Sequence, residues 1–178
     1  MDLFSKIKSG KIAVILHAKY FHFVNWLFSN LVKHAPTNKL RVAILKISKA
    51  EVGKGLQIHK GNEINDFTKL KIGSNVIIGP KNCFFSRGGI EIGDNVLISG
   101  HSKFISQSHN TKGKEFECMY KPIKIKEGAW IAIQVVINYG VTVGRNAVIG
   151  SGAVVREDAP DKAVVIGNPA RVITTRDK

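Results

Sequence analysis

The hydrophobic positions of the chain recur with a period of six residues over more than half of its length. In the clearest run an aliphatic residue stands at every sixth position, namely Ile125, Ile131, Ile137, Val143, Ile149 and Val155. The residues four places after the first five are small or β-branched: Ala129, Val135, Val141, Ala147 and Ala153. Six consecutive matches on one phase indicate a repeated structural unit.

The same spacing is present earlier in the chain, in three shorter blocks. These are Val52, Ile58 and Ile64, then Ile72, Ile78 and Phe84, then Ile92, Ile98 and Phe104, with steps of eight residues between blocks at 64–72 and 84–92. A period of six fits neither an α-helix nor the alternation of a single strand. It predicts an all-β solenoid over residues 50–173, in which each short strand contributes one inward aliphatic side chain and glycines occupy the turns.

The N-terminal residues follow a helical pattern instead. Apolar residues return at three- or four-residue spacing, which predicts an amphipathic helix over about residues 12–34. Pro36 ends it, because proline cannot continue a helix. Thr37 or Asn38 can cap a second, short helix that runs to about Ile47. We therefore expect three parts: a basic helical segment over 1–49, the solenoid over 50–173 and a tail over 174–178.

Charge adds a question about the helical segment. The chain of 178 residues has a net charge of +14, and residues 1–49 contain nine Lys or Arg and one acid, Asp2. The apolar face of this segment either packs on the solenoid or rests on anionic lipid headgroups, and both can hold at once. No DNA- or RNA-binding motif accompanies the charge, so we expect no nucleic-acid partner.

Two further features concern location. Cys83 and Cys118 are too few for a disulfide framework, which predicts reduced thiols. No apolar run approaches the length of about 20 residues that a membrane-spanning helix needs. The apolar stretch after Lys11 is short and is interrupted at His17, which does not favour a secretory signal. We expect a cytoplasmic protein, with peripheral membrane association as an open alternative.

Residues 106–122 interrupt the repeat, and long loops in repeat proteins are often functional. The loop contains His109, and a histidine titrates near neutral pH, so it suits the removal of a proton from an alcohol. Asn110 follows it and can form a hydrogen bond, but it brings no charge to the imidazole. The acids Glu115 and Glu117 and a backbone carbonyl are the other candidates to orient the ring.

Several motifs resemble those of the hexapeptide-repeat acyltransferases. They are Ile92 to Val96 (Ile-Gly-Asp-Asn-Val), Gly128 to Ile131 (Gly-x-Trp-Ile), Gly140 to Gly144 (Gly-Val-Thr-Val-Gly) and Gly167 to Arg171 (Gly-Asn-Pro-Ala-Arg). Ser108-His109 in the off-repeat loop, with Lys121-Pro-Ile123 closing it, is most similar to exopolysaccharide O-acetyltransferases of the colanic-acid type. The resemblance implies a left-handed parallel β-helix, a homotrimer, and transfer of an acetyl group from acetyl-CoA to a carbohydrate hydroxyl.

The resemblance also implies site residues. His109 would be the general base, with Asn110 beside it. The expected contacts to coenzyme A are Trp130, Ala132, Ser151, Arg156, Asn168 and Arg171. The expected contacts to the acceptor are Phe85, Arg87, Tyr120 and Lys121. No metal is expected. Relatives usually have Gly at Ala132, a small residue at Ile133 and often Lys at Glu157, so we expect a tighter groove and one phosphate contact fewer.

The sequence also allows three other functions. A metal enzyme of the γ-carbonic-anhydrase kind would need three convergent histidines, for which His59, His101 and His109 are available. An acyl carrier protein could replace coenzyme A as the donor, because an acidic partner suits a basic surface. A solenoid that docks on membranes without catalysis is the third.

Overall fold

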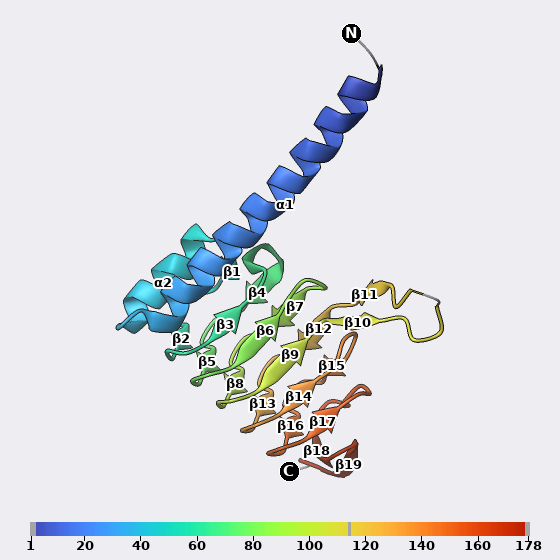
Figure 1. Ribbon diagram of the computed structural model, residues 1–178. Helices are drawn as coiled ribbons and strands as arrows, with labels where there is room; N and C mark the ends of the chain where they lie inside the picture. Colours follow the sequence, from blue (N-terminus) through green and yellow to red (C-terminus); the bar gives the residue numbers. More distant parts are fainter. Residues whose placement is uncertain (1–2, 114, 177–178) are drawn as a thin grey trace.

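The computed structural model describes residues 3–113 and 115–176, with the side chains of the first helix described at residues 14 and 16 and from 18 onward. The chain forms a solenoid of short parallel strands with two helices at its N-terminal end (Figure 1). The solenoid has three flat sides, one sheet to each side. The predicted all-β solenoid is therefore confirmed.

The three sheets are built from strands that the chain visits in rotation. Sheet A contains β1 (Glu51–Val52), β4 (Leu70–Ile72), β7 (Ile90–Ile92), β12 (Ile123–Ile125) and β15 (Thr142–Val143). Sheet B contains β2 (Gln57–Ile58), β5 (Ile77–Ile78), β8 (Leu97–Ile98), β13 (Trp130–Ile131), β16 (Val148–Ile149), β18 (Ala163–Gly167) and, antiparallel at its end, β19 (Ala170–Thr175). Sheet C contains β3 (Glu63–Ile64), β6 (Cys83–Phe85), β9 (Lys103–Ile105), β14 (Val136–Ile137) and β17 (Val154–Val155).

The aliphatic residues of the repeat stack in columns inside the solenoid. In sheet B, for example, Ile58 pairs with Ile78, which pairs with Ile98, and all three are buried. In sheet C the column contains Phe84 and Phe104, whose rings stack 4.8 Å apart. Each coil therefore buries its inward residues only against the coils above and below it.

The eight-residue steps in the sequence are wider corners between sheets C and A. Val52 pairs with Ile72, twenty residues later, whereas Ile125 pairs with Val143, eighteen residues later. Each of the first coils therefore has two extra residues at this corner. In the first coil the corner contains the short 3₁₀ helix η1 (Phe67–Lys69). The long insertion after β9 leaves the solenoid at the same corner and forms an antiparallel hairpin of β10 (Gln107–His109) and β11 (Cys118–Tyr120).

The two helices cover the N-terminal end of the solenoid. Helix α1 spans Leu3–His34 and helix α2 spans Asn38–Ile47, with Thr37 as its N-cap. The first helix begins earlier than its apolar periodicity predicts, because the polar residues before position 12 include no proline to stop it. Strand β19 reaches Thr175, so the expected tail is partly strand. Within the described residues, no helix combines the length and the apolar character needed to cross a membrane.

Side chains from both helices form hydrogen bonds with backbone N–H and C=O groups at the edge of the first coil. The Asn38 amide accepts from Ile58 N and donates to Leu56 O, and the buried Arg41 side chain donates to Ile58 O at 2.6 Å. Asn25 of α1 accepts from Phe67 N at 3.2 Å. An uncovered edge strand would offer free backbone groups to other chains, and these contacts occupy them.

Candidate functional site

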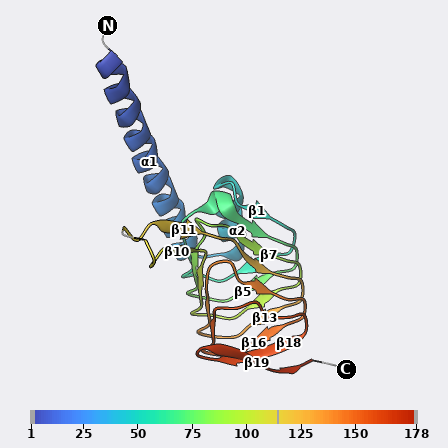
Figure 2. The same ribbon diagram turned by 90° about the vertical axis from the view of Figure 1, so that its right-hand side faces the viewer.

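His109 lies near the tip of the hairpin, which stands out from the solenoid on the side opposite β13 (Figure 2). The hairpin is the long loop that the sequence singled out, and its strand pairing brings His109 opposite Cys118. The imidazole is exposed to solvent, so a substrate can reach it.

A backbone carbonyl orients the His109 ring. Its Nδ1 atom lies 2.7 Å from Phe116 O, and a carbonyl oxygen can only accept a hydrogen bond. Nδ1 therefore carries the proton of the neutral ring, and the lone pair is on Nε2, which is left for a substrate. Phe116 has a positive φ of 45°, a backbone conformation that turns its carbonyl within the loop. Of the three candidates that the sequence left open, the structure selects the carbonyl.

Asn110 has a different structural role. Its side-chain oxygen accepts a hydrogen bond from Lys112 N at 3.0 Å, and its own N–H donates to Glu117 O at 2.8 Å. These bonds hold the turn that keeps Phe116 in reach of His109. The position of Asn110 therefore supports the loop around the histidine.

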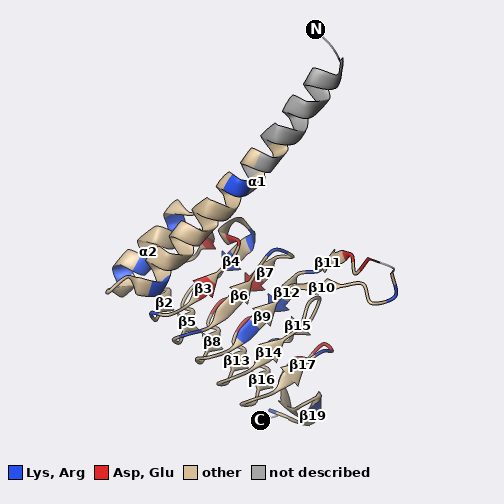
Figure 3. Ribbon diagram, viewed as in Figure 1, with Lys and Arg blue, Asp and Glu red and all other residues tan. Residues whose placement is uncertain are grey.

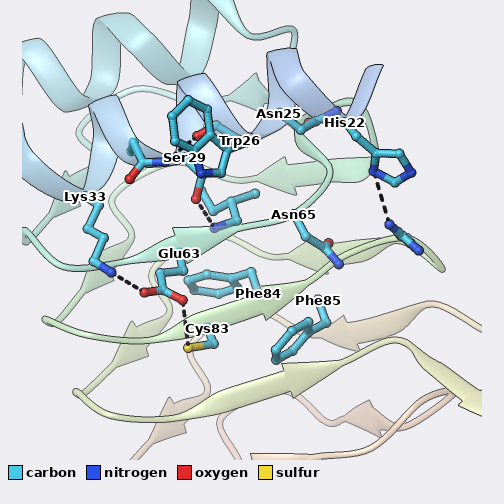
Figure 4. Close-up of a pocket in the computed structure, with 13 residues that line it drawn as sticks. His22, Asn25, Trp26, Ser29, Lys33, Glu63, Asn65, Cys83, Phe84 and Phe85 are labelled. Carbon is cyan, nitrogen blue, oxygen red and sulfur yellow. Dashed lines mark hydrogen bonds and ion pairs between the residues drawn. The ribbon is translucent and has the colours of Figure 1, made fainter. Parts of the chain in front are cut away.

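A pocket of about 370 Å³ lies between α1 and the strands β3 and β6 (Figure 4). Helix α1 supplies His22, Trp26 and Lys33 to its wall, and Phe85 and Arg87 lie on the opposite side. Two of the expected acceptor residues are thus brought together here. Tyr120 and Lys121 are not among its lining residues; they lie at the end of the hairpin.

Ion pairs and hydrogen bonds give the pocket a polar lining. The Lys33 ammonium lies 2.5 Å from the Glu63 carboxylate, and this hydrogen bond raises the pKa of Lys33. Cys83 Sγ lies 3.9 Å from the other Glu63 oxygen, and burial raises the pKa of the Cys83 thiol, with the Glu63 charge as a smaller cause. Arg87 lies 3.4 Å from His22 Nδ1. The six-residue repeat gave no signal for His22 or Lys33, because α1 lies outside the repeat, and none for Glu63, which is an outward-facing residue of β3.

The pocket and the hairpin are joined through Ser106. Its N–H donates to Phe85 O at 3.0 Å, and its hydroxyl accepts from Gly88 N at 2.9 Å. The next residue, Gln107, begins β10 and has a side-chain oxygen that is buried without a hydrogen-bond partner.

The residues expected to contact coenzyme A lie elsewhere on the solenoid. Trp130 is on the outer surface of sheet B, 44% exposed, with its Nε1 3.4 Å from Ser99 Oγ. Ser151 and Asn168 are exposed in the turns that follow β16 and β18. Ala132, in contrast, is buried, and its N–H already donates to Ile149 O at 2.9 Å. The Ala132 amide is therefore used in the hydrogen-bond ladder between coils.

The two arginines expected at the phosphates are both exposed near the C-terminal end of the solenoid. Arg156 follows β17 directly, and Arg171 is in β19. Arg171 donates to Ala170 O at 2.8 Å and lies 4.0 Å from the Glu157 carboxylate. Both side chains of this pair are exposed, so the ion pair is weak.

The histidines do not converge. His59 and His101 are in turns between sheets B and C, whereas His109 is on the hairpin at the corner between sheets C and A. Among the residues that the structure describes, no group of three His, Cys, Asp or Glu side chains is arranged to hold a metal ion. This geometry does not favour the γ-carbonic-anhydrase alternative.

In one chain the histidine and the tryptophan are on opposite sides of the solenoid. A three-sided solenoid has an edge opposite each face, and the C–A edge that bears His109 is opposite the sheet B face that bears Trp130 (Figures 1 and 2). A single chain therefore does not bring both residues to one substrate.

Comparison with known proteins identifies this architecture. The family model described as bacterial transferase hexapeptide (six repeats) matches residues 122–157. The putative colanic acid biosynthesis acetyltransferase WcaF of Escherichia coli is 32% identical over 136 residues, which cover 76% of this chain and 75% of that protein. The chain belongs to the hexapeptide-repeat transferase family. The galactoside O-acetyltransferase of Escherichia coli is 32% identical over 151 residues, which cover 82% of this chain and 74% of that protein.

Other members of the hexapeptide-repeat family are similar over different lengths. The probable acetyltransferase Rv3034c of Mycobacterium tuberculosis is 31% identical over 74% of this chain, which spans about half (46%) of that protein. A hexapeptide-repeat acetyltransferase of Vibrio cholerae, solved in complex with acetyl coenzyme A, has the same fold. It aligns with a TM-score of 0.83 and 24% identity over 90% of this chain and 89% of that one.

Proposed function

We propose that the protein transfers an acetyl group from acetyl-CoA to a hydroxyl of a carbohydrate, with His109 as the general base. The observation that carries this proposal is the hydrogen bond between His109 Nδ1 and Phe116 O, 2.7 Å long, which leaves Nε2 unprotonated on an exposed ring. The relatives named above support it, because two of them are named as acetyltransferases of polysaccharide or sugar metabolism.

The chemistry follows from the tautomer. His109 Nε2 takes the proton of the acceptor hydroxyl while the hydroxyl oxygen forms a bond to the thioester carbonyl carbon. The tetrahedral intermediate then collapses, the carbon–sulfur bond breaks, and the coenzyme A thiolate takes the proton back from Nε2. The Phe116 carbonyl stabilises the transient imidazolium by accepting from Nδ1–H. General base catalysis of this kind typically contributes about 10²- to 10⁴-fold to the rate. Neither cysteine takes part.

The donor site requires a second copy of the chain. His109 and Trp130 are on opposite sides of one solenoid, so a ring of copies would place the hairpin of one against sheet B of the next. Such a head-to-tail contact closes into a ring when the rotation allows it, and the resemblance to the family implies a ring of three copies. A homotrimer with the site between subunits is therefore part of the proposal.

The outer surface of sheet B supports such a contact. Ile77, Leu97 and Trp130 are aligned by the strand register and are all more than one third exposed. The outer surface of sheet A has a different character, since Glu51, Lys71 and Glu91 follow one another there in the same way. The apolar character of this column supports sheet B, rather than sheet A, as the face that contacts another copy.

The pocket beneath α1 is the proposed acceptor site. Its volume is suitable for one or two sugar rings, and Trp26 and Phe85 offer the flat apolar surfaces on which sugars stack. Lys33, Glu63 and Arg87 supply charged groups for hydroxyls. Ser106 connects this pocket to the hairpin, so a sugar that extends from the pocket toward β10 approaches His109.

The test begins with the donor. Calorimetry with acetyl-CoA should give micromolar binding that weakens in Arg171→Ala, and thiol release should follow when a panel of sugars and glycan fragments is added. His109→Ala should keep acetyl-CoA binding while release falls at least about 100-fold. Absence of binding at millimolar acetyl-CoA, or full thiol release by His109→Ala, would overturn the proposal.

A further inference from the structure

The first half of α1 extends away from the solenoid. Both views of the ribbon show the helix leaving the first coil and projecting beyond it (Figures 1 and 2). All residues described between 14 and 20 are exposed, and contact with the solenoid begins near Asn25, whose side chain accepts from Phe67 N. Helix packing on the solenoid therefore accounts for the second half of α1 but not for the first.

One face of the helix is apolar and turned away from the solenoid. It is formed by Leu16, Tyr20, Phe23, Leu27 and Leu31, which we call the outer stripe. These side chains are between 40% and 67% exposed. At about 100° per residue their positions fall within about 80° of one another around the helix axis. The face that packs on the solenoid, with Asn25, Phe28 and Val32, is on the opposite side.

The charge carried by the two helices is of one sign. Neither α1 nor α2 contains an Asp or Glu, and the described parts of both helices show basic side chains and no acidic ones (Figure 3). Lys19, Lys39 and Lys46 are exposed. Lys33 is not counted, because Glu63 pairs with it.

An apolar face among basic residues favours one kind of partner. Two copies of such a helix would bring like charges together, whereas an anionic lipid surface attracts each exposed lysine. Tyrosine and phenylalanine side chains are suited to the boundary between headgroups and acyl chains, where apolar residues insert while lysines remain among the headgroups.

We propose that the outer stripe of α1 docks the protein on anionic lipid bilayers, with the helix lying along the membrane surface. The docking does not depend on the proposed acetyl transfer. Docking would nevertheless affect acetyl transfer, because the same helix forms one wall of the proposed acceptor pocket. Docking would hold that pocket beside the bilayer, where a lipid-borne acceptor is located.

The test is flotation of the whole protein with vesicles of phosphatidylcholine alone and of phosphatidylcholine mixed with phosphatidylglycerol. The expected result is binding to the anionic vesicles only, and loss of that binding as salt is raised. Tyr20→Ser with Phe23→Ser should lower binding at least about tenfold. Lys19→Glu should lower it to a smaller extent. The matched control is Val172→Ser with Ile173→Ser, which removes two exposed apolar side chains from β19 and should leave flotation unchanged.

Two measurements keep the result interpretable. Thermal unfolding checks that the variants still fold, which we expect because the stripe is exposed. Acetyl-CoA binding checks that a loss of vesicle binding does not come from damage to the donor site. Equal binding to neutral vesicles, or unchanged binding by the stripe variant, would overturn the proposal. So would a change of oligomeric mass in the stripe variant, measured by sedimentation, because the stripe would then contact another copy of the chain.

Discussion

The Nδ1 atom of His109 and the carbonyl oxygen of Phe116 are 2.7 Å apart, across the loop that joins the two strands of the hairpin. This contact fixes the tautomer of the ring without any charged partner. The backbone at Phe116, rather than its side chain, supplies the oxygen. Substitutions at the two positions should therefore have very different effects.

His109→Ala should lower turnover at least about 100-fold, because it removes the proposed general base. Phe116→Ala should stay within about threefold of wild type, because the carbonyl remains and the lost side chain is exposed. Phe116→Pro should behave like His109→Ala, since proline cannot adopt the positive φ of this position. Steady-state kinetics would check this, and equal losses in Phe116→Ala and His109→Ala would contradict it.

Mixed oligomers test whether the site is shared between chains. His109→Ala and Trp130→Ala should each be weakly active alone, because one lacks the base and the other the donor surface. When both are co-expressed in equal amounts, about one quarter of the interfaces should combine an intact His109 with an intact Trp130. Activity should therefore recover to about a quarter of wild type. No recovery in oligomers proven to be mixed would show that each chain forms its site alone.

The apolar column on sheet B should control assembly. Leu97→Asp should dissociate the oligomer, because it places a charge in the centre of the proposed interface. Lys124→Asp on sheet A, also exposed, serves as the matched control and should leave the mass unchanged. Sedimentation measures both. An intact oligomer in Leu97→Asp would place the interface on another face.

The helical cap should contribute to stability through Arg41. Arg41→Met should destabilise the protein by about 2–4 kcal/mol, since the buried guanidinium donates to Ile58 O and Ala35 O at 2.6 Å each and both carbonyls would lose a charged donor. Lys46→Met, on the same helix but exposed, should change stability by less than about 0.5 kcal/mol. Urea unfolding followed by circular dichroism would compare them. Equal stability of the two variants would mean that the cap is not coupled to the solenoid.

The two cysteines should differ in reactivity. Burial raises the pKa of Cys83, which keeps it as the unreactive thiol at a pH where an ordinary cysteine begins to ionise. Cys118 is exposed on the hairpin. Iodoacetamide near pH 8 should therefore label the exposed Cys118 first, and raising the pH further should speed the labelling of Cys83. Mass spectrometry of peptides gives the order, and faster labelling of Cys83 would refute it.

Much of the fold was accessible from the sequence because the repeat is local. An inward residue at every sixth position defines the strand spacing, and stacking on neighbouring coils requires no long-range information, as Ile125 above Val143 illustrates. Pro36 and Thr37 likewise marked the break between the helices through local chemistry. His109 stood out as a candidate because its loop departs from the repeat.

The tertiary structure decided what depends on contacts between distant segments. The partner of His109 is a carbonyl, and every residue type carries one, so the sequence has no signal for Phe116. The pocket depends on the packing of α1 against the first coils, which brings Lys33 to Glu63, thirty residues later in the sequence. Ala132 has a suitable position in the motif, yet the ladder between coils occupies its amide. The sequence by itself determined the solenoid and its exceptional loop, because both follow from local periodicity. The packing of distant segments decided which atoms of the site are free and which sides of the solenoid they occupy.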